Sequence, residues 1–143
     1  MTSTTPSTPP SPAANPEPLA PIAYDVFAKL DLRVATIVSA EPHPNADKLL
    51  KVKLDDGTPE GRQVCAGIKA WYDPATLVGK QVIIVANLEP RQLRGEISQG
   101  MILAATDLKD GAVLTEGEKL GPDGRDVVIL TVATPVRPGS KVS

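Results

Sequence analysis

The feature that most constrains this chain is a series of short aliphatic segments, each followed by glycine, proline or acidic turn residues. In the clearest of them, residues 50–54, apolar residues alternate with Lys51 and Lys53, which is the period of a strand with one buried face. Asp55-Asp56-Gly57 follows with residues typical of a tight turn. Segments this short do not form the long amphipathic helices of a bundle, so they predict an all-β architecture.

The same kind of pattern recurs along the chain. It predicts strands over residues 32–40, 50–54, 63–68, 81–88, 101–105 and 127–133. Short helices are expected over residues 24–30 and from Asp73 to Gly79, because Asp73 is a good N-cap and Pro74 suits the first helical position. Residues 109–126 are expected to form a loop. We therefore predict an all-β OB-fold, a five-stranded Greek-key barrel with short helices and a C-terminal β extension.

Residues 1–21 differ from the rest, because they are rich in proline, serine and threonine and Glu17 is their only charge. Such a segment cannot bury enough apolar surface to offset its ordering entropy, so we expect a disordered tail over residues 1–21 and one domain over residues 22–143. The tail has neither the basic start nor the apolar stretch of a secretory signal. No run of about 18 apolar residues is present, so we expect no membrane association and a cytoplasmic location.

The composition limits the chemistry of the domain. Cys65 and His43 are the only cysteine and histidine, so cysteine-based zinc sites and metal clusters lack ligands. We expect no catalytic residues, no metal and no cofactor, and therefore no enzyme. Cys65 is expected in the core, His43 in loop structure, and Trp71 and Tyr72 at the end of the barrel. A net charge of −2 means that any nucleic-acid contact must come from a local patch.

Three segments contain more polar residues than turns require. The first, residues 41–49 between the first two strands, offers Asn45 as an acceptor, Asp47 as a counter-charge and Lys48 as a cation. Such groups can contact phosphates and ribose hydroxyls. The segment can equally be a capped polar turn in which Asn45 only satisfies loop amides.

The other two segments follow the most apolar strand, over residues 86–95 and 96–101. One presents two arginines three residues apart, and the other places a serine and a glutamine before a glycine that lets another backbone approach closely. The structural alternatives are a solvated charged face and a bulge beside a bend of the barrel. The residues concerned are Arg91, Arg94, Ser98, Gln99 and Gly100.

Short sequence blocks follow one another in a distinctive order between residues 26 and 142. They are DLRV, HPNADKL, AGI, YxP, LVGK, VANLxP, LRG and SQGMxLAA. This order resembles the tRNA-binding domain family, an OB-fold module. The family occurs as a free-standing dimeric tRNA-binding protein, at the C-terminus of bacterial methionyl-tRNA synthetases and in cofactors of eukaryotic synthetase complexes.

The resemblance implies which residues meet tRNA, because these blocks lie on one face of the family's barrel. Glu89 departs from the family, in which a basic residue is common at that position, and we expect Arg91 and Arg94 to compensate for the lost positive charge. The expected tRNA-binding residues are Arg33, Asn45, Lys48, Asn87, Arg91, Arg94, Ser98, Gln99 and Met101.

The resemblance also implies non-catalytic, structure-specific binding of tRNA. The protein would act alone or as a trans-acting partner of an aminoacyl-tRNA synthetase, of the methionyl-tRNA synthetase beta-subunit type. Aromatic residues make up only 3% of the chain, which favours recognition of the shape of folded tRNA over stacking on splayed bases. The alternative is a CsaA-type peptide-binding secretion chaperone with the same fold, and the intact HPNADKL and SQGM blocks favour tRNA.

The last predicted strand bears on the oligomeric state. Residues 127–130 and Val132 are all apolar, so a lone strand would expose some of them to water. Exposed apolar patches mark interfaces, and two-fold dimers are the commonest closed assembly. We predict a homodimer, as the resemblance also implies, sealed by the N-terminal helix region and residues 113–136.

Overall fold

The barrel is organised around one long strand that bends in its middle. In the computed structural model, which describes residues 17–110, 112 and 121–143, β1 (Leu32–Pro42) pairs with two antiparallel strands. Its first half pairs with β4 (Gln81–Val85) and its second half with β2 (Leu50–Asp55). A register shift between Ile37 and Ser39 marks an irregularity of the β-bulge kind, which bends the strand and lets the sheet curl on itself.

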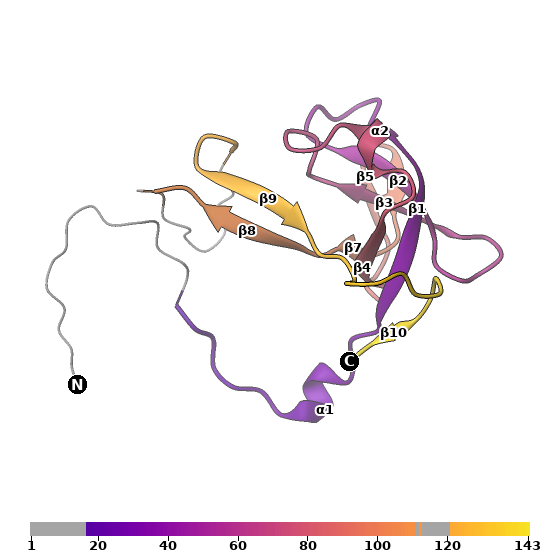
Figure 1. The fold of residues 1–143 in the computed structure, drawn as a ribbon, viewed down its shortest axis with the longest axis vertical. Coiled ribbons are helices and arrows are strands. Elements are labelled where there is room, and N and C mark those ends of the chain that lie inside the picture. The colour runs from indigo at the N-terminus through magenta and orange to yellow at the C-terminus, as the bar shows by residue number, and fades with distance from the viewer. Residues whose placement is uncertain (1–16, 111, 113–120) are drawn as a thin grey trace, which may run out of the picture.

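Further strands extend the sheet to both sides. β3 (Arg62–Ala66) pairs with β2, β7 (Met101–Ile102) pairs with β4, and β10 (Lys141–Val142) pairs with the start of β1. The two edges meet where the backbone N–H of Gln99 donates to the Gln63 carbonyl at 2.7 Å. In return, the backbone N–H of Gln63 donates to Oε1 of Gln99 at 3.0 Å. The sheet is therefore nearly closed, which confirms the predicted all-β, OB-like barrel (Figure 1).

Two short helices and two hairpins complete the described chain. They are α1 (Tyr24–Phe27), α2 (Pro74–Leu77), the hairpin of β5 (Arg91–Leu93) with β6 (Glu96–Ser98), and the hairpin of β8 (Ala104–Leu108) with β9 (Arg125–Ile129). Asp73 caps α2 as predicted, because its side chain accepts a hydrogen bond from the N–H of Ala75 and Pro74 stands in the first turn. The first helix is shorter than predicted and ends at Phe27.

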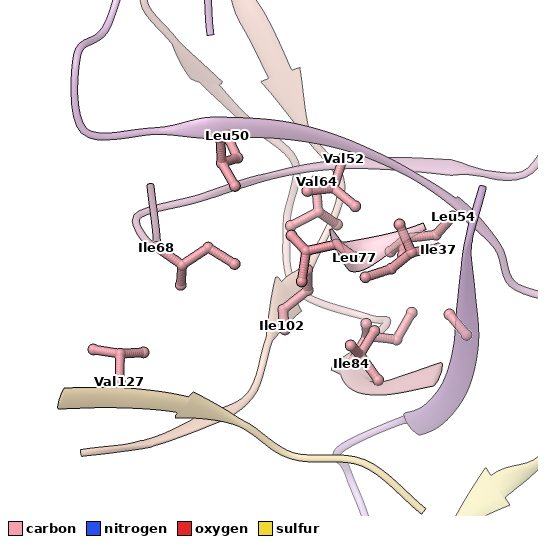
Figure 2. Packing of buried hydrophobic residues seen from close by; sticks show 12 residues of the cluster. Ile37, Leu50, Val52, Leu54, Val64, Ile68, Leu77, Ile84, Ile102 and Val127 are labelled. Carbon is pink, nitrogen blue, oxygen red and sulfur yellow. The ribbon is translucent and has the colours of Figure 1, made fainter. Parts of the chain in front are cut away.

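The core is aliphatic and lies inside the curled sheet (Figure 2). In β2 the apolar residues of 50–54 are buried, while Lys51 is half-buried and Lys53 is exposed, as the alternation predicted. Leu77 of α2 is fully buried among the strand residues. Val127 of β9 lies at one margin of the same cluster, so the second hairpin also shares the core.

Two local predictions were wrong. Cys65 is half-buried rather than part of the core, because its neighbour Val64 takes the buried position and successive residues of a strand face opposite sides. Residues 91–98, over which no strand was predicted, form the β5–β6 hairpin. Its strands are short and mostly exposed, so the sequence carries little apolar alternation there.

The predicted C-terminal strands also have different ends. The strand expected over residues 101–105 is divided between β7 and β8, and the one expected over residues 127–133 begins at Arg125 and ends at Ile129. The N–H of Leu130 still donates to the Leu103 carbonyl at 3.1 Å, and further along the chain a side chain of β4 holds Val136. Gln81 accepts from the N–H of Val136 through Oε1 at 3.0 Å and donates to its carbonyl through Nε2 at 2.7 Å.

β8 and β9 form an arm that projects from the barrel (Figure 1). Trp71 donates through Nε1 to the Arg125 carbonyl at 3.1 Å, and the Arg125 guanidinium lies 5.0 Å from the centre of the indole ring. The Tyr72 hydroxyl accepts from the N–H of Ile129 at 3.1 Å. Both aromatic rings pack against the core, so they attach the arm to the barrel. Most of the predicted tail (residues 1–16) and part of the predicted loop (residues 111 and 113–120) lie outside the described residues.

Candidate nucleic-acid interface

The β1–β2 loop (residues 43–49) is organised around a buried imidazole. His43 is only 4% exposed, although it lies between two prolines in a surface loop. Its Nε2 donates to the carbonyl of Leu93 in β5 at 2.7 Å, and its Nδ1 accepts from the backbone N–H of Asn45 at 2.9 Å. These two partners assign a neutral ring with the proton on Nε2. His43 therefore serves the structure of the loop, as predicted.

The turn of the β5–β6 hairpin lies directly against this loop. Leu93 pairs with Glu96, so Arg94 and Gly95 form a two-residue turn with φ of 52° and 92°. Positive φ at both central residues is the type I′ geometry of tight hairpins. Nδ2 of Asn45 donates to the Arg94 carbonyl at 3.1 Å. The loop and the turn, far apart in sequence, are thus bonded at two consecutive carbonyls.

Exposed cations gather on these two bonded segments. Lys48 lies in the loop, and Arg91 and Arg94 lie in the hairpin. Over the described ranges, none of the three forms an ion pair. Lys51 on β2 differs, because its ammonium lies 3.3 Å from the Glu41 carboxylate, and this hydrogen bond raises the pKa of Lys51 above its ordinary value.

The turn between β6 and β7 is built into the barrel wall. Ser98 is buried, and its hydroxyl accepts from the N–H of Cys65 at 3.0 Å and donates to the Gly100 carbonyl at 3.2 Å. Gly100 has φ of 126°, and a Cβ there would lie 2.6 Å from the carbonyl oxygen of Val85, so only glycine fits. Because Gln99 closes the barrel against β3, the polar groups of this turn mainly hold strands together.

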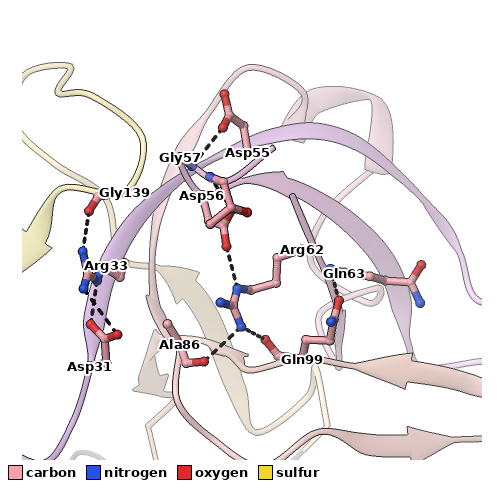
Figure 3. Close-up of polar contacts among 11 residues, drawn as sticks. Asp31, Arg33, Asp55, Asp56, Gly57, Arg62, Gln63, Ala86, Gln99 and Gly139 are labelled. Atoms are coloured by element: carbon pink, nitrogen blue, oxygen red, sulfur yellow. Dashed lines mark hydrogen bonds and ion pairs between the residues drawn. The ribbon is translucent and has the colours of Figure 1, made fainter. Parts of the chain in front are cut away.

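An ion pair between the buried Asp56 and the half-buried Arg62 supports the same turn (Figure 3). Nε of Arg62 lies 2.9 Å from Oδ2 of Asp56, and Nη1 of Arg62 donates to the carbonyls of Ala86 at 2.9 Å and Gln99 at 2.7 Å. Burial alone would raise the pKa of Asp56, but hydrogen bonds from Thr58 and Arg62 outweigh it and hold the pKa below its ordinary value. The sequence interpretation missed this pair, because Asp56 was assigned only to a turn.

Two further predicted residues lie at the opposite end of β1. Arg33 is paired with Asp31 through Nε and Oδ1 at 2.6 Å and donates through Nη1 to the Gly139 carbonyl at 3.1 Å (Figure 3). Asn87 accepts from the N–H of Asp31 at 2.8 Å and donates to the Lys29 carbonyl at 2.7 Å. Arg33 therefore ties the C-terminal segment to β1, and Asn87 ties the segment before β1 to the chain that follows β4.

An open groove of about 650 Å³ lies beside these elements. Its lining includes Lys53 of β2, Gln63 of β3, Ile97 of β6 and Gln99. Lys53 and Gln63 were not among the predicted site residues, although the alternation in β2 already placed Lys53 on the outer face. The groove thus offers Lys53, amides and the exposed side chain of Ile97 to a ligand, while Asp55 and Glu60 add acidic groups to the same lining.

No helix in the described ranges is long and apolar enough to cross a bilayer. Among the same residues, no three histidine, cysteine, aspartate or glutamate side chains gather as ligands for a metal ion. Met101, the last predicted site residue, is exposed on β7.

Comparisons with known proteins identify the family of this chain. Residues 32–141 match the family model described as "Putative tRNA binding domain". The methionine–tRNA ligase of Rhodopirellula baltica is 47% identical over 127 residues, which are 88% of this chain but only 16% of that protein. The crystal structure of a MetRS related protein from Pyrococcus horikoshii superposes with a TM-score of 0.70 at 30% identity, covering 87% of this chain and 100% of that one. The crystal structure of the chaperone CsaA from Bacillus anthracis superposes with a TM-score of 0.66 at 27% identity, and it covers 87% of this chain and 100% of that one.

The match to the family model runs from the first residue of β1 into β10. It therefore takes in the whole barrel, the β1–β2 loop, the β5–β6 hairpin and the turn before β7. On this basis the chain belongs to the tRNA-binding domain family.

Proposed function

We propose that this chain binds folded tRNA without catalysing a reaction, and that the β1–β2 loop and the β5–β6 hairpin meet the phosphate backbone. One observation carries the proposal: the family match includes two bonded segments whose exposed cations have no acidic partner in the described residues. Contacts from lysine and arginine to phosphates supply most of the affinity of such proteins. A local patch of this kind suffices in a chain of net charge −2.

The predicted site residues divide into two groups. We propose that the exposed, unbonded members contact tRNA, together with Lys53 of the groove. These members are Lys48, Arg91, Arg94 and Met101. The other members bond to the protein and hold the surface in shape. They are Arg33, Asn45, Asn87, Ser98 and Gln99.

We further propose that the protein works as a homodimer. Ile22 is 65% and Tyr24 75% exposed in the segment before β1, and Val128 and Leu130 are exposed where β9 returns to the barrel. A second copy would cover apolar side chains that water otherwise solvates. Two linked copies would also present two tRNA-binding faces and so raise the effective concentration for the second contact.

We base the proposed cellular role on the relatives. Because a methionine–tRNA ligase contains a similar segment within a much longer chain, we propose that this protein acts alone or in trans with an aminoacyl-tRNA synthetase, in the cytoplasm. In either role it would hold tRNA, and the synthetase would perform the chemistry.

Retention of three ligands on the immobilised protein tests the proposal. Total tRNA, an unstructured RNA of equal length and a permanently unfolded polypeptide are compared at two salt concentrations. We expect tRNA to bind most tightly. Its affinity should fall with salt, because binding releases counterions from the tRNA and the free energy gained from this release shrinks as the salt concentration rises. Binding of the polypeptide without tRNA would overturn the proposal.

A second candidate is a CsaA-type peptide-binding chaperone. It is favoured by the structural similarity to CsaA, which covers the whole of that chain. The groove with its exposed Ile97 is the feature that a peptide could use. Retention of the unfolded polypeptide in the same experiment decides between the two functions.

A further inference from the structure

The contact between the β1–β2 loop and the β5–β6 turn has a consequence for Arg94. We propose that His43 and Asn45 are positioning residues, which hold the turn so that Arg94 is presented to a phosphate of the RNA. The proposal rests on the proposed function and concerns how that surface is built. It changes the role of Asn45 from an RNA contact to a support.

The backbone conformation of Arg94 is not explained by the needs of the fold alone. Its φ of 52° is the only positive value at a non-glycine residue in the described chain. Glycine, asparagine and aspartate suit the first position of a type I′ turn, and a long side chain is unusual there. The guanidinium forms no hydrogen bond or ion pair with the described residues, so no polar contact of this side chain stabilises the fold. Backbone strain of this kind concentrates at functional sites.

The loop restrains this turn at two points. The carbonyl of Leu93 accepts from Nε2 of His43 at 2.7 Å, and the next carbonyl, that of Arg94, accepts from Nδ2 of Asn45 at 3.1 Å. Fixing two consecutive carbonyls fixes the backbone on both sides of the Arg94 Cα, and so the direction in which its side chain leaves the turn.

His43 also acts through Asn45. Its Nδ1 accepts from the backbone N–H of Asn45 at 2.9 Å, which places the Asn45 amide beside the Arg94 carbonyl. The ring is buried, and both of its nitrogens are bonded, so it cannot swing away without losing two hydrogen bonds. Restraint before binding lowers the entropy that the surface loses when RNA docks.

A double-mutant cycle between His43 and Arg94 tests the proposal. Affinity for total tRNA is measured against salt for the full chain and for Arg94→Ala, His43→Phe and the double variant. We expect each single variant to bind about tenfold more weakly and to lose about 0.7–0.9 from the slope of log affinity on log salt. The double variant should bind no more weakly than His43→Phe alone, because the contact of Arg94 is already lost once the turn is no longer held.

Two controls keep the outcome clear. Lys80→Ala removes an exposed cation outside these segments and should change neither affinity nor slope appreciably. Asn45→Ala replaces His43→Phe in the cycle if the latter does not fold, since Asn45 is exposed and loses only its bond to the Arg94 carbonyl. Arg94→Lys should recover part of the affinity, because it restores the charge.

The possible failures are distinct. If the unchanged protein does not retain tRNA, the proposed function itself fails. If it retains tRNA but Arg94→Ala binds equally well, Arg94 does not contact a phosphate and this inference is wrong. If the effects of His43→Phe and Arg94→Ala, or of Asn45→Ala and Arg94→Ala, simply add, the loop does not position Arg94 and the inference is also wrong.

Discussion

Two polar clusters of this barrel use the same residue types in opposite ways. Around Arg62, the guanidinium is bonded to Asp56 and to two carbonyls inside the barrel wall. On the β1–β2 loop and the β5–β6 hairpin, Lys48 and Arg94 are exposed, and neither belongs to an ion pair in the described chain. A buried charge requires protein partners, whereas an exposed charge stays hydrated until a ligand replaces the water. Burial and partners therefore separate the cations that hold the barrel from those available to RNA.

The largest expected effect is on the stability of the first cluster. Arg62→Ala leaves the Asp56 carboxylate buried without its cation and frees the carbonyls of Ala86 and Gln99. We expect the free energy of unfolding in urea to fall by about 3 kcal/mol. Arg91→Ala is the matched control, because Arg91 is exposed, and it should change stability by less than about 0.5 kcal/mol. Equal losses for the two variants would contradict the distinction between the clusters.

The next largest effect concerns Ser98, which the family resemblance placed among the tRNA contacts. Ser98→Ala leaves the N–H of Cys65 without its acceptor inside the barrel wall, so we expect a loss of about 2 kcal/mol in unfolding free energy. The tRNA affinity of the folded protein should stay unchanged. Ser39→Ala, at an exposed serine of β1, serves as the control. If Ser98→Ala binds tRNA more weakly while its stability is unchanged, Ser98 contacts tRNA and this prediction is wrong.

The sequence predicted the barrel well where alternation and burial coincide. In β2 the alternation of residues 50–54 identified both the core side and the outer side, which carries Lys53. Asp73 and Pro74 predicted the start of α2 because a helix cap depends only on neighbours in the chain. Cys65 was misplaced because residue type was given more weight than its position beside Val64.

The candidate site was less predictable, because its contacts join segments that are distant in sequence. The partners of Arg62 lie in a turn, at the end of β4 and before β7, so no local pattern indicates them. The β5–β6 hairpin has no Asn-Gly or Asp-Gly signal, since Arg94 takes the first turn position. The motif blocks pointed to the β1–β2 loop and to the residues of the β5–β6 hairpin as candidate segments, but only the three-dimensional contacts distinguish supporting residues from exposed ones.

A smaller effect, on affinity alone, is expected at Lys48. Lys48→Ala removes one exposed cation from the β1–β2 loop, so tRNA affinity should fall about tenfold, or about 1.4 kcal/mol, and the salt slope by about 0.7–0.9. The melting temperature should not change, because Lys48 forms no ion pair in the described ranges. Lys48→Arg keeps the charge and should restore the slope. An unchanged slope in Lys48→Ala would remove the loop from the proposed interface.

The smallest effect is a difference in acid sensitivity between the two clusters. The pKa of Asp56 is held below its ordinary value of 3.8 because hydrogen bonds from Thr58 and Arg62 outweigh its burial. The unfolded chain therefore takes up this proton at a higher pH than the folded chain does. The stabilisation that the carboxylate contributes is complete above the unfolded pKa and is lost as pH falls through the folded pKa.

This linkage predicts how two variants melt in acid. Between about pH 5 and pH 3, the melting temperature of the unchanged protein should fall more steeply than that of Arg62→Ala, in which the Asp56 pKa is no longer lowered by a cation. The melting temperature of Lys48→Ala should fall as steeply as that of the unchanged protein, because Lys48 is exposed and has no part in the ion pair of Asp56. Calorimetry over this pH range measures all three. If the melting temperatures of Arg62→Ala and of the unchanged protein fall in parallel, the Asp56–Arg62 pair contributes nothing to acid sensitivity. The difference between the two polar clusters would then rest on burial alone.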